Sequence, residues 1–388
     1  MSDPLLLPPG TRLVHVGPHK TGTTAIQSAL FHHRELLAEH GVLYAGDRQH
    51  SSVAVKSLTG QAPSHRRADP EGRRWRALAR QVRRAGEQRV VLSSEVLSDL
   101  DDAAAERMLD DVERHRVHVV VTVRPLASIL PSQWQQRVQL GERLTYEDWL
   151  RSLLDDPDGS LGRAMWRRHR HDDVVRRWAS RVGTENVTVV VVDAADRTAL
   201  TRAFEQMLGL PQDSLVPPPD ETNANRSLTL GEAEVVRQVN LLADGAGVDR
   251  RTYSGLMRYG AITYLKGRPP AADEPAVSTP AWALPRVGGI GRASADGIEA
   301  SGVRVVGDLD VLRAEPLLRG DPSAAPVVTP EIAARAFVAA VVGTRRHVRH
   351  EARSEARTPV AEPTTAELVQ LLRDRARARL TRRRQPPA

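Results

Sequence analysis

The segment Arg12–Thr24 has the sequence RLVHVGPHKTGTT and decides which fold the chain is expected to adopt. Its first half, Arg12–Gly17, is almost continuously apolar, which is typical of a strand buried on both faces of a sheet. A glycine-bearing turn follows, and a helical pattern begins at Thr23. A strand, a turn and a helix in this order direct backbone N–H groups and the positive end of a helix dipole at one point, which predicts an anion-binding loop.

Three further runs, Arg89–Ser94, Val117–Val123 and Val187–Asp193, have the same apolar, β-branched composition. Helical patterns accompany them at Thr23–His40, Asp101–Arg114, Tyr146–Leu154, Asp172–Arg181 and Thr198–Leu208. This alternation predicts an α/β fold, a parallel β-sheet flanked by helices and built from right-handed crossovers. Ligands of such sheets bind at the carboxyl ends of the strands.

The rest of the chain is less regular and predicts an extension of the α/β domain. We expect that domain at residues 1–268, with its motifs at about 10–240, and a C-terminal extension at 269–388. Tyr44–Arg84 is a polar excursion with one helix near Trp75–Arg84. The later segments are a helix at Ser227–Leu242, a Pro/Ala-rich linker at Pro269–Pro285, a small strand-and-helix appendage at Gly288–Leu318 with its strand at Val303–Val306, and helices at Pro330–Val342 and Thr364–Leu380, the last one basic.

Composition excludes several classes of protein. The 388 residues, 40% of them hydrophobic, can bury a full core. The chain has no cysteine, which excludes disulfides, thiolate metal sites and a cysteine nucleophile. The start of the sequence has no basic region before its short leucine run, and no apolar stretch reaches the length of a membrane span, so a cytoplasmic protein is expected. The net charge of +7 favours anionic ligands, whereas an aromatic content of 4% argues against binding single-stranded nucleic acid.

The loop itself is not an ordinary triphosphate loop. A Walker A loop ends in Gly-Lys-Ser/Thr, but here Thr23 follows Gly22, and Lys20 lies two residues before the glycine. The loop resembles the 5′-phosphosulfate loop of the sulfotransferase family, and the form HVGPHKTGTT looks like the bacterial branch of that family. The resemblance implies that Lys20 approaches the oxygen that bridges phosphate and sulfonate in 3′-phosphoadenosine 5′-phosphosulfate (PAPS). It implies that the 5′-phosphate is held by the loop residues His19, Lys20, Thr21, Gly22, Thr23 and Thr24.

A second segment strengthens the resemblance. Arg124 ends the third predicted strand, and Ser132 follows eight residues later. In the family, an Arg and a Ser at this spacing bind the 3′-phosphate of PAPS, and a guanidinium fork suits a phosphate. We expect Arg226 and Ser227, in the turn Asn223–Ser227, to close over the nucleotide; the alternative is a helix cap. The Arg-Lys-Gly motif of eukaryotic members has no clear counterpart, with Lys266-Gly267 the nearest pair.

Three residues are candidates for the general base. Glu95 follows the second strand, and some sulfotransferases use a Glu in this role while others use a His. Its alternative role is a helix N-terminal carboxylate. His50, in the polar excursion, and His19, in the loop, are the rival bases.

The sequence therefore predicts a PAPS-dependent sulfotransferase that needs no metal. Its acceptor, a hydroxyl or amine of a glycan, lipid, small molecule or peptide, stays open at this point, as does the oligomeric state. A variant P-loop kinase or NTPase, with Asp193 as the magnesium carboxylate, is one alternative. A non-catalytic nucleotide-binding scaffold is the other.

Overall fold

The computed structural model describes residues 5–58, 72–196, 198–218, 226–249, 252–253, 257–315, 325–339 and 341–343. The predicted helix Thr364–Leu380 lies outside the described residues, as do Asn223–Asn225 of the predicted nucleotide-closing turn.

The centre of the fold is a six-stranded parallel sheet with the strand order β2-β3-β1-β4-β5-β6. The strands are β1 (Arg12–Val16), β2 (Val42–Tyr44), β3 (Arg89–Ser93), β4 (Val117–Val123), β5 (Val187–Val191) and β6 (Arg304–Val306). All four strands predicted for the α/β domain are present. The sheet and the helices around it confirm the predicted fold class.

Alternate residues of each strand enter two different apolar layers. Leu13 packs with α1 (Thr23–His32), α2 (Arg34–Glu39) and α10 (Ala199–Leu208) on one face of the sheet. Its neighbour Val14 packs into the layer on the opposite face. The helices of that layer are α3 (Ser52–Leu58), α4 (Arg73–Arg84), α5 (Asp102–Asp111), α9 (His171–Val182) and α15 (Leu284–Ala300). The burial of both faces explains why the strand sequences are continuously apolar rather than alternating.

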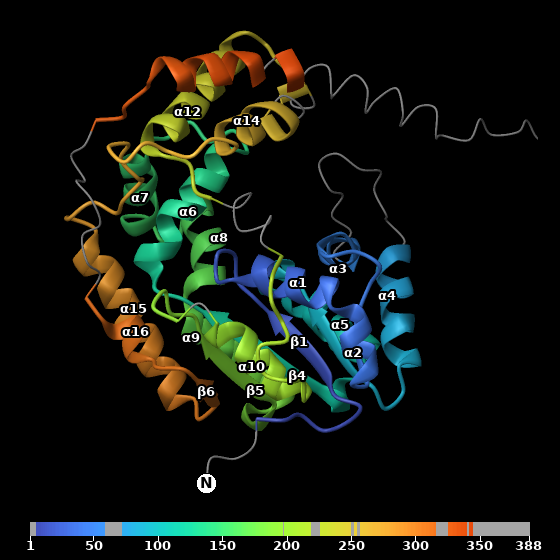
Figure 1. Cartoon of the computed structure of the whole chain (residues 1–388). Helices are drawn as coiled ribbons and strands as arrows, with labels where there is room; N and C mark the ends of the chain where they lie inside the picture. The colour runs from blue at the N-terminus through green and yellow to red at the C-terminus, as the bar shows by residue number, and fades with distance from the viewer. Residues whose placement is uncertain are drawn as a thin grey trace, which may run out of the picture.

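A second body of helices lies next to the sheet, on the side where α6 leaves β4 (Figure 1). It has its own apolar core around Trp134, Trp149 and Trp166. Its elements are α6 (Leu126–Val138), α7 (Tyr146–Leu154), α8 (Ser160–His169), α12 (Leu230–Gly245), η4 (Met257–Ala261), α14 (Ile262–Lys266) and a helix at 330–339. None of the helices in the described ranges combines the length and apolarity needed to cross a bilayer.

Several helices differ from the sequence predictions: α5 ends at Asp111 rather than Arg114, the polar excursion holds α3 as well as α4, and two further boundaries have a visible local cause. The helix predicted at Thr23–His40 is interrupted at His33, whose backbone leaves the helical region and whose Nδ1 donates to the Ala29 carbonyl. The helix predicted from Ser227 begins at Leu230. Its start is fixed by a capping box in which Thr229 and Glu232 bond to each other's backbone N–H.

The prediction of a small appendage at Gly288–Leu318 is wrong, because this segment belongs to the main fold. Its strand, β6, pairs in parallel with β5 and extends the main sheet. Its helix, α15, packs against α9 and α6, and Ala295 and Ile298 enter the same apolar layer as the central strands. The β-branched run of β6 therefore pairs with β5 at the edge of the sheet, although more than a hundred residues of chain separate the two strands.

Candidate functional site

The loop between β1 and α1 contains two residues in the left-handed region of backbone conformation. Lys20 has a φ of 71° and Gly22 a φ of 92°. A left-handed conformation is uncommon for a residue with a side chain and costs about 1–2 kcal/mol. A Cβ on Gly22 would also meet the Leu200 side chain at 2.8 Å. Such outliers are typical of ligand-binding loops.

The side chains inside the loop hold its shape. Thr21 donates its N–H and its hydroxyl to the Pro18 carbonyl, at 3.2 and 2.7 Å. Thr23 donates its hydroxyl to the Gly17 carbonyl at 3.1 Å. Among the described residues, no protein acceptor is seen for the N–H groups of Gly22, Thr23 and Thr24. Of the amides that the sequence assigns to the phosphate, Thr21's is used within the loop, and these three are open at the start of α1.

Lys20 places a cation beside these amides. Burial and the nearby charge of Lys266 lower the pKa of Lys20 to about 8, and the carboxylate of Glu95 acts in the opposite direction. Lys266 ends α14, in the second body of helices, and burial together with Arg226 lowers its pKa as well. The charge of Lys266 disfavours the protonated form of Lys20, so an anion placed near the two ammonium groups would stabilise this part of the site.

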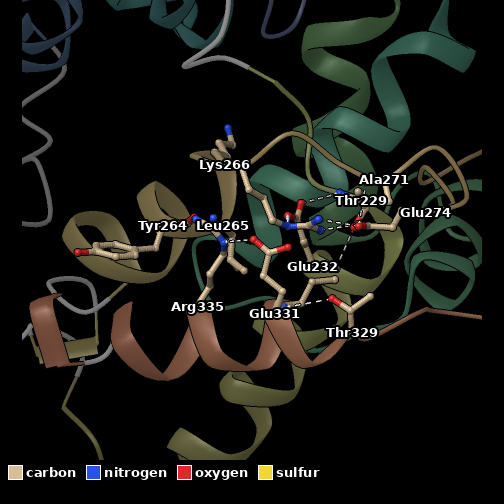
Figure 2. Close-up of polar contacts among 12 residues, drawn as sticks. Thr229, Glu232, Tyr264, Leu265, Lys266, Ala271, Glu274, Thr329, Glu331 and Arg335 are labelled. Atoms are coloured by element: carbon tan, nitrogen blue, oxygen red, sulfur yellow. Dashed lines mark hydrogen bonds and ion pairs between the residues drawn. The ribbon is translucent and has the colours of Figure 1, made fainter.

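A buried ion network holds the turn that carries Lys266 (Figure 2). Glu232 receives two hydrogen bonds from Arg226, at 2.8 and 2.9 Å, and one from Arg268 at 2.9 Å. Arg268 also bonds both oxygens of Glu274, and these bonds lower the pKa of Glu274 to about 2. Figure 2 shows the amine of Lys266 directed away from this network.

The guanidinium group of Arg226 forms its hydrogen bonds within that network and with neighbouring carbonyls. Its five N–H donors bond Glu232 and the carbonyls of Ser227, Leu265 and Lys266. No donor remains for a phosphate in this arrangement. Arg226 is expected from the sequence to close over the nucleotide, whereas its observed contacts support the turn that carries Lys266.

The second group of predicted site residues lies at the end of β4. Arg124 follows that strand and donates from Nη1 to the Lys20 carbonyl at 3.4 Å, which links it to the loop. Its own carbonyl accepts from Nε2 of the buried His171 at 3.0 Å. A cavity of about 640 Å³ brings together three of the predicted residues, Arg124, Ser132 and Ser227. Ser128, Gln135 and Asp193 line it as well.

The three candidate bases lie in different surroundings. Glu95 opens the 3₁₀ helix η1 (Glu95–Asp99) after β3, close enough to Lys20 to raise its pKa. His19 Nε2 lies 3.7 Å from Asp99, which also pairs with Arg168. His50 is exposed, and its Nδ1 lies 2.6 Å from Oε1 of Gln27 on α1.

Lys266 and Gln27 are the residues that sequence reasoning did not assign to the site. For Lys266, the Lys266-Gly267 pair is the one indication in the sequence. For Gln27, a single glutamine within a helical pattern gives no indication. In the described part of the chain, no group of three or more His, Asp or Glu side chains could hold a metal ion.

Comparisons with known proteins add little to this geometry. The chain matches no protein-family model and no curated protein. Among solved structures it is similar to the crystal structure of a sulfotransferase from Alicyclobacillus acidocaldarius. The two share 18% sequence identity and a TM-score of 0.38, over 60% of this chain and 95% of that one. A likeness of this extent carries no conclusion about the chemistry of this chain.

Proposed function

We propose that this protein transfers the sulfonate group of PAPS to a hydroxyl or amine of an acceptor and releases 3′-phosphoadenosine 5′-phosphate (PAP). The observation that carries the proposal is the pair of anion-binding features on adjacent strands. One is the loop after β1 with Lys20 and Lys266, and the other is the cavity after β4 with Arg124 and Ser132. A nucleotide phosphorylated at both 5′ and 3′ positions needs two such features.

The geometry is less suited to a magnesium triphosphatase built on Asp193. Such an enzyme needs a carboxylate near the phosphate loop to hold the ion. Asp193 follows β5, two strands from β1, and a Cβ on Gly22 would lie 4.0 Å from the side chain of the preceding Val192, so the carboxylate's own contacts decide the question. The Asp193 carboxylate instead accepts from the Ala195 N–H at 2.9 Å.

The residues present can perform the transfer by positioning and charge stabilisation. The acceptor atom attacks sulfur in line, a new bond to sulfur forms, and the bond from sulfur to the bridging oxygen breaks. The negative charge that develops on the departing 5′-phosphate faces the ammonium group of Lys20, with Lys266 and the amides of Gly22, Thr23 and Thr24 beside it. Arg124 and Ser132 would hold the 3′-phosphate and so fix the register of the nucleotide. The proton of the acceptor passes to a side-chain base.

Calorimetry with PAP and AMP tests the proposal, because the two nucleotides differ only in the 3′-phosphate. PAP should bind more tightly than AMP, and Arg124→Ala should reduce PAP affinity by about 10- to 100-fold while leaving AMP binding nearly unchanged, as expected for a lost charged hydrogen bond. Arg137→Ala, in the helix that carries Ser132, is the matched control. Preference for Mg-ATP over PAP, or equal effects of Arg124→Ala on PAP and AMP, would overturn it.

A further inference from the structure

A chain of buried side-chain hydrogen bonds runs beneath the loop, across the carboxyl ends of three neighbouring strands. The hydroxyls of Thr21 and Thr122 lie 2.8 Å apart, and Nε2 of His15 lies 3.2 Å from Thr122. Nδ1 of His15 lies 2.8 Å from the hydroxyl of Ser93, and Nε2 of Gln27 donates to that hydroxyl at 3.2 Å. All five side chains are almost completely buried, so each hydrogen bond must be satisfied within the chain.

The direction of every bond in this chain follows from its first member. Thr21 gives its single hydroxyl proton to the Pro18 carbonyl, which can only accept. Thr122 must therefore donate to Thr21, and His15 must donate to Thr122 from Nε2. Because burial lowers the pKa of His15 to about 3, the ring is neutral and its Nδ1 accepts from Ser93. Ser93 in turn accepts from Gln27, as its bond requires.

The hydrogen bonds of Gln27 determine which ring nitrogen of His50 carries the proton. Nε2 of Gln27 also donates to the Ser93 carbonyl at 3.1 Å, which sets the orientation of the amide. The amide oxygen of Gln27 then faces Nδ1 of His50 at 2.6 Å. An amide oxygen only accepts, so Nδ1 of His50 carries the proton. In the neutral ring, Nε2 is then the nitrogen with the free lone pair.

We propose that Gln27 is a positioning residue that fixes His50 as its Nδ1–H tautomer, leaving Nε2 of His50 to take the proton of the sulfonate acceptor. This inference rests on the proposed function. The acceptor's O–H or N–H bond breaks as its bond to sulfur forms, and the proton goes to Nε2 to give an imidazolium. His19 faces the carboxylate of Asp99, and Glu95 faces the ammonium of Lys20. His50 is thus the candidate whose proton-accepting atom is set by a buried neutral partner.

His50 also lines a cavity whose walls carry both apolar and polar side chains. Among the described residues, Asp47, Arg48 and Arg74 are the charged ones that line the same cavity, and Gln81 lines it as well. Gln81 bonds the Gly46 N–H, at 2.8 Å. The cavity therefore offers a glutamine for a control substitution that alters its lining but not the bond to His50.

Nuclear magnetic resonance of the full chain labelled with ¹⁵N-histidine tests the inference. Two-bond ¹H–¹⁵N correlations separate the two neutral tautomers, and His50→Asn assigns the signal. At a pH where the ring is neutral, His50 should show the Nδ1–H pattern. Gln27→Leu should shift it toward the Nε2–H form that free histidine prefers in water. Gln27→Glu, which keeps an acceptor oxygen, should restore the Nδ1–H pattern, and Gln81→Leu should leave the spectrum of His50 unchanged.

Each outcome decides whether Gln27 sets the tautomer of His50, without reference to turnover. An Nε2–H pattern in the unaltered chain, or an Nδ1–H pattern that survives in folded Gln27→Leu, would overturn it. Folding of the variants is checked by their thermal melting, and Gln27→Asn, which shortens the amide by one carbon, is the substitute if Gln27→Leu does not fold. Because the experiment uses no nucleotide, a failure to bind PAP would remove the proposed function and leave the tautomer result standing.

Discussion

Two features of Lys20 are unfavourable in free energy. Its backbone is left-handed, and its half-buried ammonium group lies near a second cation. Neither stabilises the unliganded protein. Both become favourable once an anion lies between Lys20, Lys266 and the amides at the start of α1, because the ligand neutralises charges that are already in place. Under the proposed function, the loop is thus arranged for the 5′-phosphate before the nucleotide binds.

The lowered pKa of Lys20 predicts how PAP binding depends on pH. Only the protonated amine attracts the phosphate, so affinity should fall as the pH rises from about 7 through about 8. Binding at pH 8.5 should raise the pKa of Lys20 and take up a proton, which calorimetry in buffers of different ionisation enthalpy measures. Lys20→Arg should abolish this uptake, because the guanidinium stays charged.

Lys56→Arg, on α3, is the matched control and should retain the proton uptake of the unaltered chain. If the uptake is unchanged in Lys20→Arg, the proton belongs to another group, and Lys20 does not contact the phosphate.

The sequence predicts those site residues that lie just after a strand. Lys20, Glu95 and Arg124 follow β1, β3 and β4, and neighbouring parallel strands bring their ends together without further information. Lys266 and Gln27 could not be predicted in this way. Their relation to the site depends on how the second body of helices packs and on which face of α1 is turned to Ser93.

At the scale of elements, the network around Glu232 joins the start of α12 to the end of α14. Glu232 completes the capping box of α12 and also receives Arg226 and Arg268, and its side chain is fully buried. The two arginines and the two glutamates of the network balance in charge. Removing one partner leaves a buried charge uncompensated. The resulting loss in the free energy of unfolding is far larger than the net stabilisation that the intact pair provides.

Arg226→Ala should therefore lower the free energy of unfolding by about 3 kcal/mol, the low end for such a change, because Arg268 still contacts Glu232. PAP affinity should fall as well, because the carbonyls of Leu265 and Lys266 lose their donors. Urea unfolding and calorimetry measure the two effects. Arg176→Ala, which breaks only exposed ion pairs, should cost less than about 1 kcal/mol. Equal stability losses in the two variants would contradict the role given to Arg226.

Helix boundaries depend on caps that a hydrophobic pattern does not show. The signature Thr229-x-x-Glu232 was present in the sequence and places the start of α12 more closely than the apolar pattern from Ser227 does. The break at His33 has no comparable signature, because the helical pattern of Thr23–His40 continues through it.

On the scale of the whole molecule, the sheet takes its last strand from far along the chain. A chain that ends at residue 268, the predicted boundary of the α/β domain, would lack α15 and β6. It should aggregate, because the edge of β5 loses its partner and α9 loses the helix α15 that packs against it. A chain that ends at residue 343 keeps every described element and should stay monodisperse in light scattering if the reasoning holds. A monodisperse, cooperatively melting chain of residues 1–268 would instead support that boundary.

The position of β6 also sets the order in which the sheet can be completed during synthesis. β5 ends at Val191, but β6 begins only at Arg304. At translation rates of about 5–20 residues per second, the ribosome delivers the intervening segment in roughly 6–20 s. During that time the valine-rich strand β5 is an exposed edge of the nascent sheet. A holding chaperone can bind this edge then, whereas in the finished molecule β6 covers it. Synonymous codons that slow translation between these strands would lengthen that period without changing one residue of the protein.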